Sequence, residues 1–260
     1  MESIRSRDNT SIAYEKSGQG APLVLVHGTS ADHTRWKPVL PPLEAKFTVY
    51  SVDRRGRGGS GDSQPYAIER EYEDIAALVD SIPEPVNLLG HSYGALCSLE
   101  AALRTKNLRR LILYEPPIPV EGMSFNFPRV MAEMQARLAA GDRDGVVTTF
   151  LHEIAEIPAD ELKMLRSLPA WQGRLAAAHT ILRELQGPPE YRIQPERLQQ
   201  IRIPTLLLLG GASPAYRKMV AEQLHAALPN SRIAVMPGQQ HTAMNTAPEL
   251  FIKEVLAFLT

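Results

Sequence analysis

The sequence predicts an α/β fold: a mostly parallel β-sheet flanked by helices, with a further block of helices inserted late in the chain. Three observations predict it. Apolar segments without polar alternation, such as 23–26 and 205–209, are typical of strands buried on both faces. Segments with helical spacing of apolar residues alternate with these strands. The chain of 260 residues, 44% of them hydrophobic, is long enough for one such fold with a sizeable core.

The chain begins with two short strands and then alternates strands with helices. Residues 3–5 and 11–15 alternate polar and apolar side chains, which predicts antiparallel strands joined by a turn at Asp8 and Asn9. The later strands are predicted at 23–26, 47–52, 86–89, 108–114, 205–209 and 231–236. The helices that belong with them are predicted at 34–45, 69–82, 95–103, 216–228 and 248–259.

Residues 118–195 form a separate block, because no segment in it has convincing strand character. Helices are predicted there at 127–140, 143–156, 159–167 and 170–185, with prolines between them. We therefore expect a core made of residues 1–117 and 196–260, with the block as a helical cap inserted after the sixth strand. A cap supplies pocket walls and can move as a lid. The side chains expected to line the pocket are Phe125, Phe127, Met131, Met134 and Trp171.

The charge balance excludes several classes of partner. The net charge is −1, with 28 basic and 29 acidic residues spread along the chain, so we expect neither nucleic acid nor a membrane surface as partner. No apolar run reaches membrane-spanning length and residues 1–10 lack a secretory apolar region, which favours a cytoplasmic protein. The single cysteine, Cys97, cannot form an internal disulfide. We expect no metal and no cofactor, and the glycine-rich loop 53–60 lacks the phosphate-binding patterns.

The pentapeptide 90–94, Gly-His-Ser-Tyr-Gly, lies between a predicted strand and a predicted helix. This is the context of a nucleophile elbow, a turn so tight that glycines are needed around it. The turn would expose the hydroxyl of Ser92, and the following helix would place amide N–H groups beside it. A serine hydroxyl needs a base to take its proton when it attacks a carbonyl, and an imidazole titrates in the useful range. His241, in the loop after the last strand, is the candidate.

Together these loops resemble the α/β-hydrolase superfamily over nearly the whole chain. The matching pieces are His27-Gly28, Asp53-x-Arg55-Gly56-x-Gly58-x-Ser60, the 90–94 elbow and Gly238-x-x-His241. The resemblance implies Ser92 as nucleophile and His241 as base. It also implies an oxyanion hole made by the backbone N–H groups of Thr29 and Tyr93. Gly28 and Ser30 are then expected to contact the substrate.

The orienting acid departs from the common pattern of the superfamily. Most members carry an Asp in the loop after the seventh strand, but here that loop is 210–214, Gly-Gly-Ala-Ser-Pro, without an acid. Glu115 ends the preceding strand, and some members, including zearalenone-type lactonases, place a Glu there. We expect Glu115 to orient His241 and Ser213→Ala to be nearly silent. The resemblance to these lactonases extends to the 210–214 loop and to the position of Trp171.

We expect a serine hydrolase that cleaves a small apolar carboxylic ester or lactone through an acyl-enzyme. A cofactor-free perhydrolase, a carbon–carbon bond hydrolase and a biosynthetic cyclase stay open, because they share the fold. A dehalogenase or epoxide hydrolase is disfavoured, because both need a carboxylate nucleophile where Ser92 stands. A non-catalytic binding protein is a further alternative, and a homodimer stays open.

Overall fold

The computed structural model describes residues 1–120, 127–186 and 191–260. An eight-stranded sheet forms the centre of the described part, in the order β1-β2-β4-β3-β5-β6-β7-β8. The strands are β1 (Glu2–Arg5), β2 (Ser11–Gly18), β3 (Ala21–Val26), β4 (Phe47–Val52), β5 (Val86–His91), β6 (Leu108–Tyr114), β7 (Thr205–Gly210) and β8 (Ser231–Met236). The sequence predicted every one of them to within a few residues.

The strand directions decide where the functional loops meet. Strand β2 pairs antiparallel with both β1 and β4, whereas β4, β3, β5, β6, β7 and β8 are mutually parallel. The loops that follow the parallel strands therefore emerge at one edge of the sheet, where ligands bind in folds of this kind. This confirms the predicted α/β class and brings the sequence motifs to a common edge.

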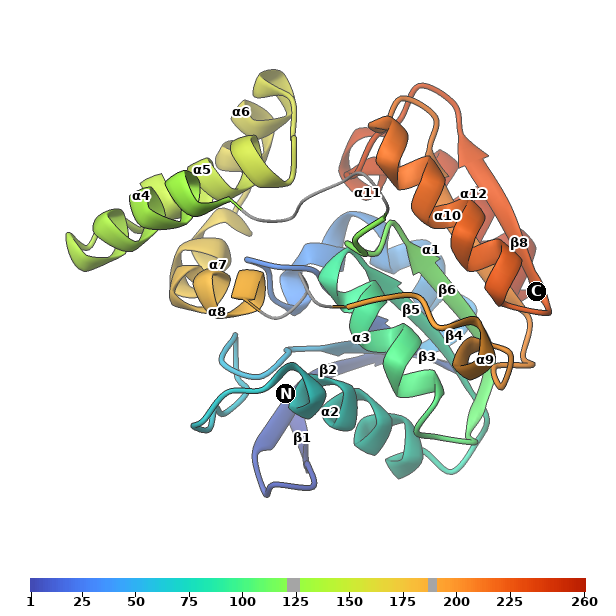
Figure 1. Cartoon of the computed structure of the whole chain (residues 1–260). Helices are drawn as coiled ribbons and strands as arrows, with labels where there is room; N and C mark the ends of the chain where they lie inside the picture. The colour runs from blue at the N-terminus through green and yellow to red at the C-terminus, as the bar shows by residue number, and fades with distance from the viewer. Residues whose placement is uncertain (121–126, 187–190) are drawn as a thin grey trace.

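Helices cover both faces of the sheet (Figure 1). On one face α2 (Ile68–Ser81), α3 (Tyr93–Ala102) and α10 (Ala215–Ala227) bury their apolar sides against the strands. The opposite face packs against the helices η1 (His33–Val39), α1 (Leu40–Glu44) and α12 (Pro248–Leu259). Two separate apolar layers result, as two-sided burial of a parallel sheet requires.

The first predicted helix, 34–45, is wrong as a single helix. The structure has the 3-10 helix η1 followed by the short helix α1. Pro38 lies inside η1, and Pro41 lies in α1, so backbone N–H groups needed for one regular helix are missing. The side chain of Asp32 caps η1 by accepting a hydrogen bond from the Thr34 N–H at 2.9 Å.

Between β6 and β7, residues 127–186 are largely helical and have their own apolar core. The elements of this part, here called the cap helices, are α4 (Pro128–Ala139), α5 (Arg143–Thr149), the π-helix η2 (Phe150–Ile154), α6 (Ala159–Ser167), α7 (Trp171–Ala176), the 3-10 helix η3 (Ala178–Thr180) and α8 (Ile181–Gln186). The predicted single helix 170–185 is therefore wrong. The Thr180 hydroxyl donates to the Ala177 carbonyl at 2.7 Å, which competes with regular helical bonding there.

Buried ion pairs join the cap helices to the loop that follows β4. Glu184 of α8 is fully buried and accepts from both Arg54 and Arg57. In the same loop, Asp53 accepts hydrogen bonds from the backbone N–H groups of His33 and Gly59, each at 2.8 Å. The 53–60 motif thus anchors neighbouring segments. Two short helices were not predicted, α9 (Pro195–Leu198) and α11 (Ala243–Thr246). No helix among the described residues is long and apolar enough to cross a bilayer.

Candidate active site

Ser92 stands at the tight turn between β5 and α3. Its backbone has φ 54° and ψ −126°, a conformation that L-residues rarely adopt and that costs energy to hold. The Ser92 N–H donates to the Tyr114 carbonyl at 2.8 Å, which fixes the turn against β6. A Cβ on Gly94 would lie 2.4 Å from the carbonyl oxygens of Val26 and His27, so only glycine allows this approach.

His241 and Glu115 meet at the same edge of the sheet. Glu115 directly follows β6, and His241 lies in the loop between β8 and α11. The distance from His241 Nδ1 to Glu115 Oε2 is 2.7 Å, and both side chains are buried. A carboxylate at this distance favours the tautomer with a proton on Nδ1, which leaves Nε2 free to act as a base.

The loop after β7 holds Glu115 although it contributes no acid. The Gly210 N–H and the Ser213 hydroxyl donate to Glu115 Oε1 at 2.8 and 2.6 Å. Sequence reasoning missed this role of Ser213, because it sought only a carboxylate in the loop. The expectation that Ser213→Ala is nearly silent is therefore revised: a hydrogen bond to a charged acceptor is lost, and such bonds contribute about 1.5–3 kcal/mol.

Arg217 of α10 is the second residue that the sequence did not indicate. Its Nη1 lies 2.9 Å from Glu115 Oε2 and also contacts His241 Nδ1. Burial alone would raise the pKa of Glu115, but Arg217 and the hydrogen bond with His241 outweigh it and lower that pKa to about 2. Burial, and then Arg217, lower the pKa of His241 to about 4. At neutral pH the pair is therefore carboxylate and neutral imidazole.

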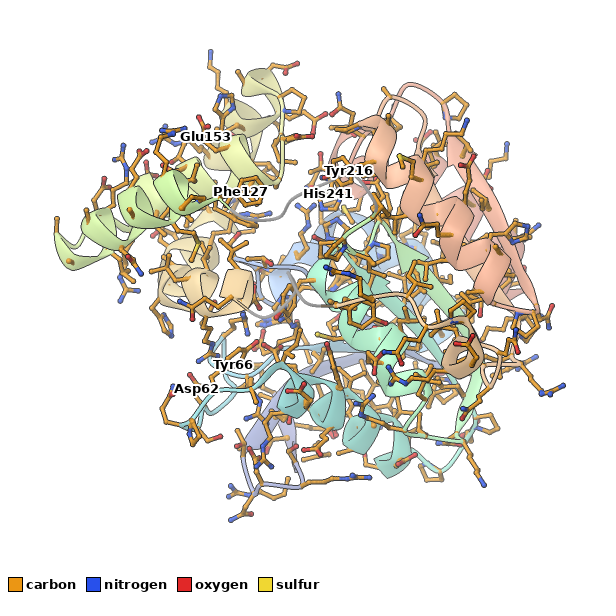
Figure 2. All side chains as sticks on the ribbon, in the orientation of Figure 1. Asp62, Tyr66, Phe127, Glu153, Tyr216 and His241 are labelled. Atoms are coloured by element: carbon orange, nitrogen blue, oxygen red, sulfur yellow. The ribbon has the colours of Figure 1, made fainter. Side chains whose placement is uncertain are left out.

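Ser92 and His241 line the same two small cavities beneath the cap helices. Thr29 lines both of them, and Tyr93 lines one. The cavities measure about 30 and about 50 Å³. Figure 2 shows His241 and Tyr216 together at the border of the core that faces the cap helices. The residues expected from the sequence to act as nucleophile, base and oxyanion donors thus line the same site.

A model of the alpha/beta hydrolase family matches residues 23–254. The chain belongs to this family. An alpha/beta hydrolase from Sphaerobacter thermophilus has a similar structure, with a TM-score of 0.85 and 37% identity over 100% of both chains. The pimeloyl-[acyl-carrier protein] methyl ester esterase of Aeromonas hydrophila is 27% identical over 96% of this chain and 99% of its own. The enol-lactonase of Burkholderia xenovorans shares the fold, with a TM-score of 0.75 and 20% identity over 99% of both chains.

Of the two loop residues predicted to contact substrate in this alpha/beta hydrolase, Gly28 lines a cavity and Ser30 does not. Gly28 lines one cavity with Ser92, and a Cβ on it would lie 2.8 Å from the Ser92 Cβ. Ser30 lines neither cavity: it is fully buried, and its carbonyl and hydroxyl oxygens each accept from Arg174 at 3.1 Å. The structure therefore places Ser30 behind the wall of the site.

The predicted cap residues pack inside the cap and do not line the two cavities. Met134 and Trp171 belong to the apolar core of the cap helices, with Met131 and Phe127 packed against it. The Trp171 Nε1–H donates to Asp144 at 2.9 Å, a partner within the cap. Phe125 lies outside the described residues. A large apolar side chain on an amphipathic helix more often packs against another helix than lines a binding site. The residue type alone therefore did not show which role these side chains have.

Other cap side chains form the walls of the two cavities. They are Phe150, Leu151, Ile154, Ala155, Ile157, Leu165, Arg174 and Leu185. Several belong to the π-helix η2 or follow it, and short π-helical segments often occur at functional sites. Helical periodicity predicts a regular helix at 143–156, so it could not show which side chains turn toward the site.

We expect Arg217→Gln to shift the acidic limb of the pH profile of kcat/KM to higher pH. This limb reports the base in the free enzyme. If that base is His241, its pKa of about 4 keeps the neutral imidazole available in mildly acidic solution. Removal of the adjacent cation favours the protonated imidazole, so the pKa rises toward its ordinary value. Profiles with a neutral aryl ester, taken where circular dichroism shows an intact fold, measure the shift.

The control is Lys218→Gln, which removes the next cation on α10. The Lys218 side chain is 69% exposed and pairs with Glu222, so its loss leaves the limb in place. An acidic limb in folded Arg217→Gln that coincides with that of the wild type would show that Arg217 does not set the basicity of His241.

Proposed function

We propose that this alpha/beta hydrolase cleaves a carboxylic ester or lactone through an acyl-enzyme. Ser92 is the nucleophile and His241 the general base. Glu115 is the acid that orients His241 and stabilises its protonated form. The observation that carries the proposal is the 2.7 Å hydrogen bond between Glu115 and His241, because His241 lines the same cavity as the strained Ser92. A serine, a histidine and a carboxylate that hydrogen-bonds to the histidine are the three groups that activate a serine nucleophile.

The reaction proceeds in two halves that use the same groups. The Ser92 oxygen attacks the carbonyl carbon while His241 Nε2 takes the hydroxyl proton. That proton then passes to the departing alcohol oxygen, and the acyl group stays on Ser92. Water gives a proton to His241 and attacks the acyl carbon, which releases the acid and restores the serine. Glu115, negatively charged throughout, stabilises the imidazolium formed in each half.

The oxyanion of each tetrahedral intermediate needs donors that are in place before the reaction. We assign this role to the backbone N–H groups of Tyr93 and Thr29. Tyr93 is the first residue of α3, so its N–H adds the positive end of the helix dipole, and Thr29 lines the same cavity. Loss of one such donor typically costs about 100- to 1000-fold in kcat.

The choice of substrate class rests on relatives and on the acid's position. The Aeromonas relative is by its name a methyl ester esterase, which supports an ester for this chain. The lactone alternative rests on the resemblance to zearalenone-type lactonases, which also place a Glu at the position of Glu115. A non-catalytic binding role is disfavoured, because it would not need a buried carboxylate and a buried imidazole held in hydrogen-bond contact at the site.

A fluorophosphonate probe tests the proposal directly. An activated serine displaces fluoride from phosphorus and keeps the phosphonyl group, so we expect one stoichiometric adduct. Digestion and mass spectrometry locate it, and the expected position is Ser92. Labelling should parallel the loss of activity toward 4-nitrophenyl acetate. No adduct, or an adduct on another serine such as the exposed Ser167, would contradict the assignment of Ser92.

A further inference from the structure

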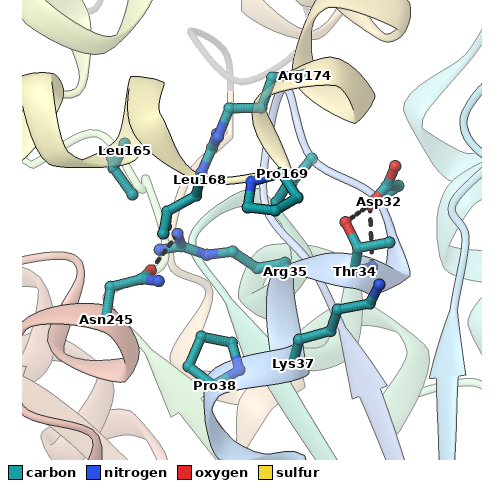
Figure 3. Close-up of a pocket in the computed structure, with 12 residues that line it drawn as sticks. Asp32, Thr34, Arg35, Lys37, Pro38, Leu165, Leu168, Pro169, Arg174 and Asn245 are labelled. Atoms are coloured by element: carbon teal, nitrogen blue, oxygen red, sulfur yellow. Dashed lines mark hydrogen bonds between the residues drawn. The ribbon is translucent and has the colours of Figure 1, made fainter.

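Two buried guanidinium groups meet beside the proposed catalytic residues. Arg35 comes from η1 in the core, and Arg174 comes from α7 in the cap. They are only 5% and 6% exposed. In Figure 3 the Arg174 side chain extends from the cap toward the guanidinium of Arg35, with Leu168 and Pro169 beside them.

The hydrogen-bond partners of these two arginines are neutral. Arg35 donates to the Asn245 side-chain oxygen at 2.6 Å and to the Met244 sulfur, whereas Arg174 donates to the carbonyl and hydroxyl oxygens of Ser30. Across the described ranges no carboxylate forms an ion pair with either group. Asp32 and Glu161 act on them only at longer range. Neutral acceptors satisfy N–H groups but do not neutralise a charge.

Other buried arginines of this chain show the contrast. Arg54, Arg55, Arg57 and Arg217 are as deeply buried, and each forms an ion pair with a carboxylate. A buried charge is normally compensated in this way, because its transfer out of water is costly. Arg35 and Arg174 therefore stand out as a pair of cations that lack a counter-ion within the described part of the chain.

The pKa values of Arg35 and Arg174 are consistent with two buried positive charges that lack a counter-ion among the described residues. Burial, and then the charge of Arg174, lower the pKa of Arg35 to about 9, and burial lowers the pKa of Arg174 to about 10. Both groups still carry a positive charge at neutral pH. An anion placed between them would relieve their mutual repulsion and return both pKa values toward the ordinary range.

The two arginines lie where a substrate would extend from Ser92. Both line the cavity that contains Ser92 and His241. Both also line an adjoining pocket of about 170 Å³, whose apolar wall is formed by Leu165, Leu168 and Pro169. Exposed Lys37 adds a third positive charge to that pocket, and Asp32, whose carboxylate accepts hydrogen bonds from Thr34, adds one negative charge. Arg35 and Arg174 therefore belong to the wall that the two cavities share.

We propose that Arg35 and Arg174 bind a free carboxylate carried by the substrate, at the end opposite the bond that Ser92 attacks. The planar guanidinium group matches a carboxylate with two parallel hydrogen bonds. The inference rests on the proposed function and refines it. The substrate is a monoester of a dicarboxylic acid or a lactone that bears an acid group, and this adds a charge to the apolar substrate expected from the sequence.

The test compares matched esters in the wild type and in variants. The substrates are 4-nitrophenyl monoesters of adipate, pimelate and suberate, each paired with the ester of equal chain length that ends in a methyl group. We expect the wild type to favour the acid-ended member at least tenfold in kcat/KM. Arg35→Gln and Arg174→Gln should each reduce this ratio at least tenfold. Arg129→Gln, which removes an arginine 74% exposed on α4, should preserve it.

A wild type that prefers the methyl-ended member, or a ratio that survives in both Arg→Gln variants, would overturn the inference while leaving ester hydrolysis established. Binding is measured separately in Ser92→Ala, which needs no turnover. Free adipate, pimelate or suberate should raise its Tm with concentration, and the added Arg174→Gln change should remove that rise. A rise produced by inorganic phosphate but by none of the diacids would also overturn the carboxylate assignment. A diacid effect without ester turnover would support this site and count against the proposed function.

Discussion

Ser92→Ala is expected to lower kcat for 4-nitrophenyl acetate by about 10⁴-fold or more, as loss of the nucleophile does in other serine triads. The change removes the oxygen that carries the acyl group in the proposed mechanism, while the proposed oxyanion donors and the cavity stay in place. The remaining rate would come from water attack within the site. Purified protein with a native circular dichroism spectrum and steady-state kinetics measure the effect.

Ser98→Ala is the matched control for that experiment. Ser98 lies on α3, is fully buried, and its hydroxyl has no hydrogen-bond partner within the described part of the chain. Removal of this hydroxyl should change kcat less than threefold. If Ser92→Ala retained more than a tenth of the wild-type rate, the acyl-enzyme mechanism at this serine would be wrong.

Glu115→Gln is expected to lower kcat by about 10³- to 10⁴-fold with little change in fold, by comparison with triads whose acid became an amide. The amide lacks the charge that stabilises the imidazolium. It also presents an NH₂ group where His241 Nδ1–H donates now, which favours the wrong tautomer. Arg217 loses its counter-ion at the same time. Steady-state kinetics across pH 5 to pH 9 separate a lost rate from a shifted pH profile.

Ser213→Ala provides the comparison within the same network. It removes one donor to Glu115 Oε1 and keeps the carboxylate, the Gly210 N–H and Arg217. A loss of about 1.5–3 kcal/mol, as expected for one charged hydrogen bond, corresponds to about a 10- to 150-fold decrease in kcat/KM. A larger loss in Ser213→Ala than in Glu115→Gln would show that the loop after β7, and not Glu115, supports the base.

The position of the proposed triad acid, Glu115, depends on both the sequence and the tertiary structure. The resemblance to the α/β-hydrolase superfamily implied Glu115, because 210–214 contains no carboxylate and some members carry a Glu after the sixth strand. The structure shows why the exchange is possible: β6 and β7 are parallel neighbours with Tyr114 opposite Leu208, so the two strand ends are adjacent. Glu115, which follows β6, and the loop after β7 therefore lie together. Glu115 supplies the carboxylate, and the loop supplies the Gly210 N–H and the Ser213 hydroxyl that donate to it.

The sequence by itself determined the order of the strands along the chain, the Ser92 turn and the loop positions of His241 and Glu115. These depend on short-range physics, namely apolar periodicity, strand burial and the glycines that a tight turn requires. Only the tertiary structure decided that Arg217 stands against Glu115, that Ser30, Met134 and Trp171 lie outside the cavity walls, and that Arg35 and Arg174 meet beside the site. Those facts depend on which faces of distant helices pack together. Helical periodicity shows that a cap helix has an apolar face, but not whether that face meets another helix or a substrate.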